Sequence, residues 1–223
     1  ARRGIPTVKG LSGDDTGATG NLGLFLAARL LQDEFRTKSE YSSILRILSG
    51  TDDEATIALV IPVDPFRGSL ADLAKSLGRE KKDGLLSRPD LLVVGVRIKN
   101  NDVRIHLTPV EVKCRLGVVF GASESKDALD QAKALSDLFE AIALRAEIST
   151  MWRLSYQHLL ISMVEFGLRV YSKSAARFSQ SLRWAQYQEK IVGTLLSIDA
   201  SKVSVDKRGR LIVIDKSENS GPR

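Results

Sequence analysis

The spacing of hydrophobic and polar positions changes several times along the chain, and each change predicts a new element. Residues 1–20 are rich in Gly, Thr and Asp and show no period, so we expect a flexible lead-in. Leucines then recur at helical spacing over residues 21–36, which predicts a first helix. Residues 42–48 and 69–77 carry shorter patterns of the same kind, and each predicts a brief helical piece.

Three runs rich in β-branched residues predict strands in the middle of the chain. The first covers residues 56–63 and is followed by the turn-forming Pro65. The second, residues 90–98, is apolar on both faces, as expected of a central strand. Residues 99–102 form a turn, and residues 103–115 return as a third strand, so the second and third strands make a hairpin.

Helical patterns dominate the second half of the chain. Ser123 or Ser125 is placed to cap a long helix that follows the third strand. Residues from about 151 to 197 are mostly helical by their period and form an insertion. Two short apolar runs, 203–205 and 211–214, flank a turn that contains glycine, which predicts a terminal β-hairpin.

These elements predict a single α/β domain over residues 21–223, with a mixed β-sheet core flanked by helices. A length of 223 residues, with 43% hydrophobic and 27% charged residues, is typical of a soluble globular domain. The apolar stretches are far shorter than the roughly 20 residues that cross a bilayer, so we expect no membrane span. The single cysteine, Cys114, excludes a disulfide framework and a multi-cysteine zinc site.

The charge of the chain favours a polyanionic partner. The formal net charge is +6 and the pI is near 9.5. The N-terminal residues lack the apolar segment of a signal peptide, and the chain starts at Ala1 rather than Met. We therefore expect a fragment of a larger, cytoplasmic protein.

The second and third predicted strands carry a cluster of charged residues. Asp90 opens the second strand, and Glu111 and Lys113 lie near the end of the third. Residues two apart in a strand point to the same face, so Glu111 and Lys113 project together. An antiparallel hairpin brings Asp90 beside Glu111, and two carboxylates and an ammonium then share one small volume.

A divalent cation removes the repulsion between two adjacent carboxylates. Mg²⁺ prefers hard oxygen ligands, and Asp90, Glu111 and the backbone carbonyl of Val112 would suit it, with Mn²⁺ as a substitute. Such an ion polarises a phosphate oxygen and promotes ionisation of water. Lys113 would orient or deprotonate that water, or stabilise charge on phosphorus. The chemistry implied is phosphodiester hydrolysis.

The spacing of these residues resembles a known family. Pro89-Asp90, twenty intervening residues and Glu111-Val112-Lys113 are similar to the motif of the PD-(D/E)XK nuclease superfamily. The predicted order α-β-β-β-α-β over roughly residues 20–146 and the final strands also resembles that family's core. The resemblance implies a restriction-endonuclease-like fold, Mg²⁺ bound by the Asp and the Glu, and a catalytic Lys.

Gln131 extends this resemblance to the following helix. It is placed like a Gln found in several branches of the superfamily, and Gln131-Ala132-Lys133 resembles the Q-x-K of Mrr-type restriction enzymes. The resemblance implies that Gln131 positions the water or the lysine. One departure is that many members place a further Glu on the first helix, where this chain offers only Asn21, Asp33 and Glu34.

The tripeptide Glu-x-Lys is by itself a weak signal. Glu80-Lys81-Lys82 and Glu124-Ser125-Lys126 match it as well, and only the copy at Glu111 sits in an apolar strand behind a Pro-Asp strand. The alternative interpretation is a solvent-facing charge pair at a strand end.

The third strand changes the parity of its apolar positions. They are odd-numbered from Val103 to Leu107 and even-numbered from Val110 to Cys114. The change predicts a bulge or kink at Thr108-Pro109, and bulges gather near active sites.

The helical insertion carries an excess of positive charge. Residues 151–190 contain six basic and two acidic side chains, interleaved with Tyr156, Tyr171, Trp184 and Tyr187. Such a surface could bind a nucleic-acid backbone and stack on bases. The alternative is an amphipathic helix pair that buries its aromatic side chains. The candidate nucleic-acid contacts are Lys126, Lys133, Arg153, Arg169, Lys173, Arg177 and Arg183.

The function we expect is Mg²⁺-dependent cleavage of DNA, by an endonuclease rather than an exonuclease. Asp90, Glu111, Lys113 and Gln131 form the expected site. By analogy, the domain would be the nuclease module of a restriction or antiphage defence protein with an ATPase or helicase region, and a homodimer would suit the cutting of both strands. The alternatives are a catalytically inactive DNA-binding or assembly domain of the same fold, and a nuclease that acts on RNA.

Overall fold

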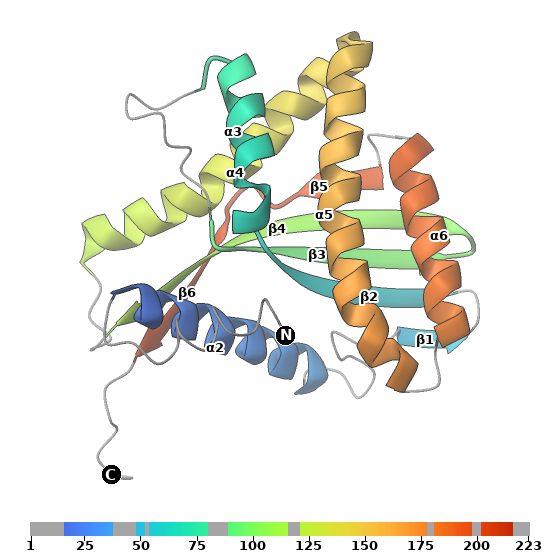
Figure 1. Cartoon of the computed structure of the whole chain (residues 1–223), viewed down its shortest axis with the longest axis horizontal. Helices are drawn as coiled ribbons and strands as arrows, with labels where there is room; N and C mark the ends of the chain where they lie inside the picture. Colours follow the sequence, from blue (N-terminus) through green and yellow to red (C-terminus); the bar gives the residue numbers. More distant parts are fainter. Residues whose placement is uncertain are drawn as a thin grey trace.

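One mixed β-sheet forms the centre of the molecule, with helices on both of its faces (Figure 1). The strands follow the order β1-β2-β3-β4-β5, and β6 also pairs with β4. This arrangement confirms the predicted mixed α/β class. The computed structural model describes residues 16–37, 48–51, 54–79, 89–115, 121–177, 181–197 and 202–215.

The elements of the described residues have the following bounds. The strands are β1 (Leu48–Thr51), β2 (Glu54–Pro62), β3 (Leu91–Lys99), β4 (Asp102–Arg115), β5 (Val203–Val205) and β6 (Arg210–Asp215). The helices are α2 (Thr16–Thr37), a short 3₁₀ turn η1 (Asp64–Phe66), α3 (Arg67–Ser76), α4 (Ala122–Ile148), α5 (Thr150–Arg177) and α6 (Ser181–Ser197).

The antiparallel meander β2-β3-β4 is the best-predicted part of the fold. Register is continuous from Glu54 opposite Lys99 to Pro62 opposite Leu91, and from Lys99 opposite Asp102 to Leu91 opposite Val110. The β3–β4 turn has positive φ at Asn100 (48°) and Asn101 (64°), as a two-residue type I′ hairpin requires. The predicted hairpin is therefore confirmed.

The two faces of the sheet have different covers. Ile57, Val96 and Ile105 stand in register on one face, and all three are almost fully buried. Helix α5 crosses this face at Gly167, where an added Cβ would meet Ile61 Cδ1 at 3.0 Å. Helix α2 covers the opposite face at the far end of β4, where a Cβ on Gly23 would lie 2.5 Å from the Cβ of Cys114.

The predicted bulge at Thr108-Pro109 is wrong. Register with β3 continues through both residues, since Thr108 lies opposite Val93 and Pro109 opposite Leu92. Even-numbered residues become buried after this point because α2 covers their face of β4. On the odd-numbered face Pro109 and Glu111 stay buried as well, so the change of parity reflects a second cover rather than an inserted residue.

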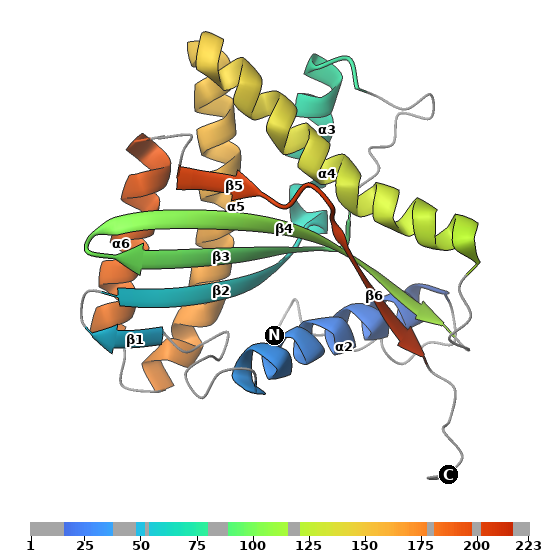
Figure 2. The same ribbon diagram turned by 180° about the vertical axis from the view of Figure 1, so that it is seen from behind.

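The predicted terminal hairpin is also wrong. Strands β5 and β6 do not pair with each other along the sheet order but lie one after the other beside β4, each parallel to it (Figure 2). Ile105 faces Val203 in the first ladder, and Val110 faces Arg210 in the second. Two short apolar runs around a glycine turn match the hairpin pattern, but both runs pair in parallel with the edge of β4 instead of with each other.

Two helix boundaries also differ from the prediction. Helix α2 begins at Thr16, inside the expected flexible lead-in, because weak helix propensities are easily overridden. Helix α4 begins at Ala122 rather than at a serine cap, and the Glu124 carboxylate accepts a bond from the Gly121 N–H at 3.3 Å. The helical piece expected at 42–48 lies outside the described residues except for Leu48, which begins β1.

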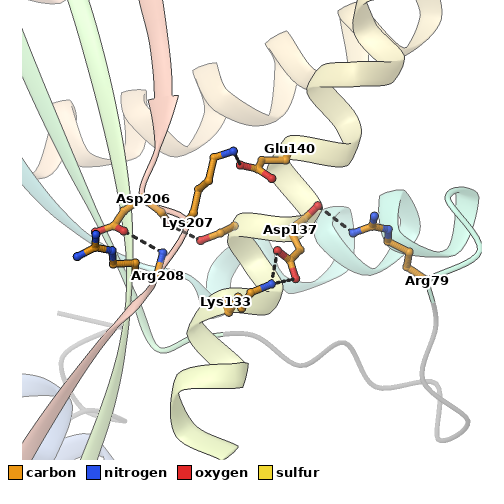
Figure 3. A network of polar contacts seen from close by, with 8 residues as sticks. Arg79, Lys133, Asp137, Glu140, Asp206, Lys207 and Arg208 are labelled. Atoms are coloured by element: carbon orange, nitrogen blue, oxygen red, sulfur yellow. Dashed lines mark hydrogen bonds and ion pairs between the residues drawn. The ribbon is translucent and has the colours of Figure 1, made fainter. Parts of the chain in front are cut away.

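The segment between β5 and β6 docks onto α4 (Figure 3). Ser136 Oγ donates to the carbonyl of Asp206 at 2.7 Å, and Lys207 Nζ lies 3.0 Å from Glu140 Oε1. Gly209 has a φ of +66°, and a Cβ added to it would lie 2.7 Å from the Cβ of Ala132. The close approach of Gly209 therefore sets the distance between α4 and the β4–β6 edge.

We predict that Gly209→Ala destabilises the protein more than Gly78→Ala. Both glycines have φ near +67°, but Gly78 has no atom within 4 Å of an added Cβ. The positive φ costs about 1–2 kcal/mol in either variant, and the collision with Ala132 adds about 1–3 kcal/mol at Gly209 only. Urea unfolding of both variants measures this difference, and equal losses of unfolding free energy would contradict the packing role of Gly209.

Candidate active site

The candidate site lies where the β3–β4 ladder ends. The last paired residues are Leu91 and Val110, so Asp90 and Glu111 are the next residues on the two strands and lie opposite each other. The Asp90 Oδ2 accepts a hydrogen bond from the backbone N–H of Val112 at 2.9 Å. The structure thus brings together the two carboxylates on which the sequence interpretation depends.

Backbone contacts fix Asp90 on its other side. Its carbonyl accepts a hydrogen bond from the Val63 N–H at 3.0 Å, just past the end of β2. Pro89 before it is buried, whereas Asp90 itself is exposed. Asp90 is therefore held in place by two strands while its carboxylate stays within reach of a ligand.

Lys113 joins the site to α4. Its Nζ donates to Glu111 Oε1 at 2.6 Å and to Gln131 Oε1 at 3.1 Å. Alternation along β4 places Glu111 and Lys113 on one face, and α4 lies over that face. Asp90, Glu111, Lys113 and Gln131 therefore form one contiguous cluster.

Glu111 is the most unusual residue of the cluster. It is only 3% exposed, and its Oε2 is buried without a hydrogen-bond partner. The pKa of this carboxyl is raised to about 7, mainly by burial and to a smaller extent by the nearby Asp90 charge, while hydrogen bonding from Lys113 and from the Asp90 backbone acts in the opposite direction. A buried carboxylate oxygen without a partner is costly unless something binds it.

The oxygens at this end of β4 suit a hard divalent cation. Glu111 Oε2 and the Asp90 carboxylate supply two charged donors. The N–H and C=O of one strand residue point to the same neighbouring strand. Because the Val112 N–H donates to the Asp90 carboxylate, the Val112 carbonyl also points toward Asp90. These donors match the preferences of Mg²⁺ and Mn²⁺, with water completing the coordination.

A third acidic ligand is not found within the described residues. Among them, no group of three or more His, Cys, Asp or Glu side chains is arranged to hold a metal. The candidate side chains on α2, those of Asn21, Asp33 and Glu34, lie outside the side chains that the structure describes. The described site is therefore a two-carboxylate site.

Four of the seven predicted basic contacts have side chains that the structure describes. Lys126, Lys133, Arg153 and Arg169 are exposed on α4 and α5. Lys133 pairs with Asp137 at 2.7 Å, and Arg169 pairs with Glu165 at 3.1 Å, each within its own helix. The side chains of Lys173, Arg177 and Arg183 lie outside the described part of the chain.

The aromatic side chains of the insertion are not available to stack on bases. Tyr156, Tyr171, Trp184 and Tyr187 are all buried, with at most 6% of each exposed. The Tyr171 hydroxyl accepts a bond from the Val60 N–H at 3.2 Å, and Trp184 Nε1 donates to the Leu168 carbonyl at 3.3 Å. These rings hold α5 and α6 against each other and the sheet, as in the alternative of an amphipathic helix pair.

The sequence interpretation overlooked Arg115. This residue continues the alternation from Glu111 and Lys113 on β4, and its Nη1 lies 2.9 Å from Glu124 Oε2 on α4. The repeated two-residue spacing was the available signal. Two other side chains of β4 lie on the opposite face of the sheet, since Cys114 packs against Gly23 of α2 and the exposed His106 forms a hydrogen bond with Ser204 Oγ at 2.9 Å.

Comparisons with known proteins add no assignment. No protein-family model, no curated protein and no solved structure matches the chain. Among the described helices, none combines the length and the apolarity that a membrane crossing requires.

We predict that Glu111 makes the metal-free protein less stable as pH rises from about 4.5 to 7. The folded state keeps the Glu111 proton up to a pKa of about 7, whereas the unfolded chain releases it near the ordinary value of 4.5. The loss of unfolding free energy is on the order of 3 kcal/mol for a pKa change from 4.5 to about 7. Glu111→Gln should remove this loss, as measured by urea unfolding in EDTA between pH 4.5 and 8.

Glu124→Gln is the matched control for this measurement. The pKa of the Glu124 carboxyl is lowered by its bond from Arg115, so its contribution is lost only as pH falls below the ordinary range. The Glu124→Gln protein should therefore lose unfolding free energy between pH 5 and 8 as the wild type does. Parallel pH profiles for wild type and Glu111→Gln would contradict the assignment of that decline to Glu111.

Proposed function

We propose that the protein is a metal-dependent nuclease that hydrolyses DNA phosphodiester bonds. The observation that carries the proposal is the buried Glu111 carboxylate, which has an oxygen without a partner and lies opposite Asp90 and beside Lys113. A charged group in this state costs folding free energy, and a functional site is a common reason to retain such a group. The net charge of +6 fits a polyanionic substrate.

Asp90, Glu111 and the Val112 carbonyl are the residues that would hold Mg²⁺. The bound ion would polarise the scissile phosphate and lower the pKa of a water molecule. Asp90 is suited to this role because the Val112 N–H fixes the position of its carboxylate. Glu111 is suited because its unpartnered oxygen needs a ligand and its neighbour Lys113 compensates only Oε1.

Lys113 is the residue placed to act on the reacting atoms. It is about one-third exposed, so a substrate can reach its ammonium group. Once Glu111 binds the metal, Lys113 can donate to a nonbridging phosphate oxygen or orient the attacking water. The bond to Gln131 Oε1 limits the rotamers of this long side chain, so Gln131 acts as a positioning residue.

A catalytically inactive DNA-binding domain is the second candidate. The two-carboxylate composition of the described site favours it, because a site with fewer acidic ligands holds a metal more weakly. Calorimetric titration with Ca²⁺ and DNA separates the two functions. If the domain is inactive, the wild type should bind DNA but show no Ca²⁺ binding that Asp90→Ala abolishes. No metal should then support cleavage.

We predict that Lys113→Ala lowers the rate of metal-dependent DNA cleavage by about 10²–10⁴-fold. The assay uses plasmid, linear duplex and single-stranded DNA and an RNA of the same sequence, with Mg²⁺, Mn²⁺ or EDTA. Preference among these substrates distinguishes endonuclease from exonuclease, and DNA from RNA.

Lys202→Ala is the matched control for the cleavage assay. Lys202 has nearly the same side-chain exposure as Lys113, 32% against 33%, and it also pairs with a carboxylate, that of Asp102. It should cleave like the wild type. Cleavage that survives Lys113→Ala, or that needs no metal, would overturn the proposed mechanism.

A further inference from the structure

A second cationic side chain lies next to the proposed site on β4. Arg115 follows Lys113 by two residues, so the two side chains share a face and their Cα atoms are about 6.8 Å apart. Helix α4 confirms the shared face, because Lys113 contacts Gln131 and Arg115 contacts Glu124, two helical turns earlier. Lys113 and Arg115 therefore form a short cationic row that leads away from Asp90.

The guanidinium of Arg115 is held in a defined orientation. Its Nη1 and Nη2 donate to the two carboxylate oxygens of Glu124 at 2.9 Å and 3.4 Å. Glu124 is fixed in turn by the Gly121 N–H at the start of α4. Arg115 remains 31% exposed, so a ligand can reach it without disturbing the strand. A preoriented guanidinium loses little side-chain entropy when it binds an anion.

The charge balance along this row changes when Glu111 engages a metal. Without the metal, Glu111 and Glu124 each face one cation, Lys113 and Arg115 respectively. When Glu111 engages a metal, its carboxylate no longer compensates Lys113, so the positive charge that Lys113 and Arg115 present on this face of β4 increases. A row of two cations at this spacing matches two consecutive phosphates of one nucleic-acid strand, which are separated by a similar distance.

We propose that Arg115 binds the phosphate adjacent to the scissile one on the DNA strand being cut. The inference rests on the proposed nuclease function, since Lys113 defines which phosphate is scissile. Arg115 forms hydrogen bonds to the nonbridging oxygens of that phosphate and makes no contact with bases. It therefore contributes affinity that does not depend on sequence, and it sets the register of the strand at the site.

The test is a salt titration of DNA binding. A fluorescein-labelled duplex is titrated with wild type, Arg115→Ala and Arg115→Lys in Ca²⁺ at several KCl concentrations, with fluorescence anisotropy as the readout. Loss of one phosphate contact should lower the slope of log Kobs against log[KCl] by about 0.9 and weaken binding about tenfold. Arg115→Lys should retain most of the slope, because it keeps the charge.

Two control variants separate binding from structure. Arg104 lies on the same strand and also pairs with a carboxylate, that of Asp102 at 3.1 Å, but it faces the opposite side of the sheet near the β3–β4 turn. Arg104→Ala should bind DNA like the wild type. Glu124→Gln removes the ion pair that orients Arg115 but keeps the Arg115 charge, so it should weaken binding and still keep the wild-type salt slope. Thermal unfolding of each variant monitors folding, and Arg115→Gln replaces Arg115→Ala if the latter is unfolded.

The outcomes distinguish the failures. A wild-type slope and affinity in Arg115→Ala would overturn the phosphate contact and leave the nuclease proposal intact. Equal losses of slope in Arg115→Ala and Glu124→Gln would show that the pair is structural, which also overturns the contact. A wild type that neither binds DNA in a salt-dependent manner nor cleaves it would instead overturn the nuclease proposal.

Discussion

Backbone groups at the end of a ladder need new partners, and this requirement shapes the whole site. Strand β4 continues to Arg115, whereas its pairing with β3 ends at Val110. The next free N–H toward β3, that of Val112, is taken by the Asp90 carboxylate. A structural need therefore places one carboxylate opposite Glu111, and the same extension of β4 presents Lys113 and Arg115 beyond it.

Helix α4 supplies the second half of the site. It packs closely on the segment between β5 and β6. A side chain larger than that of glycine at position 209 would collide with Ala132 and push the helix away. One turn of α4 then faces Lys113 with Gln131, and an earlier turn faces Arg115 with Glu124. Parallel pairing of β6 with β4 thus holds the helix that orients both cations, although β6 carries none of the candidate catalytic groups.

The sequence was informative where structure is local. Alternating apolar residues and the Lys99–Asp102 turn predicted the β3–β4 hairpin, and the hairpin register was enough to bring Asp90 to Glu111. Apart from the two helix boundaries, the errors concern long-range packing. Val110 and Val112 are buried because α2 packs on their face of β4. Strands β5 and β6 are parallel because they pair with the edge of β4. The aromatic rings of α5 and α6 are buried because these helices pack on the sheet and on each other. No local pattern carries that information.

The proposed function depends on a divalent cation that Asp90 and the unpartnered oxygen of Glu111 share. Anomalous diffraction from crystals grown with Mn²⁺ tests it most directly, because Mn²⁺ is recognised by its own scattering and shares the oxygen preference of Mg²⁺. We predict an anomalous peak about 2.1 Å from carboxylate oxygens of both residues, with the Val112 carbonyl in the same shell. Mn²⁺ bound elsewhere, with no peak between Asp90 and Glu111, would contradict it.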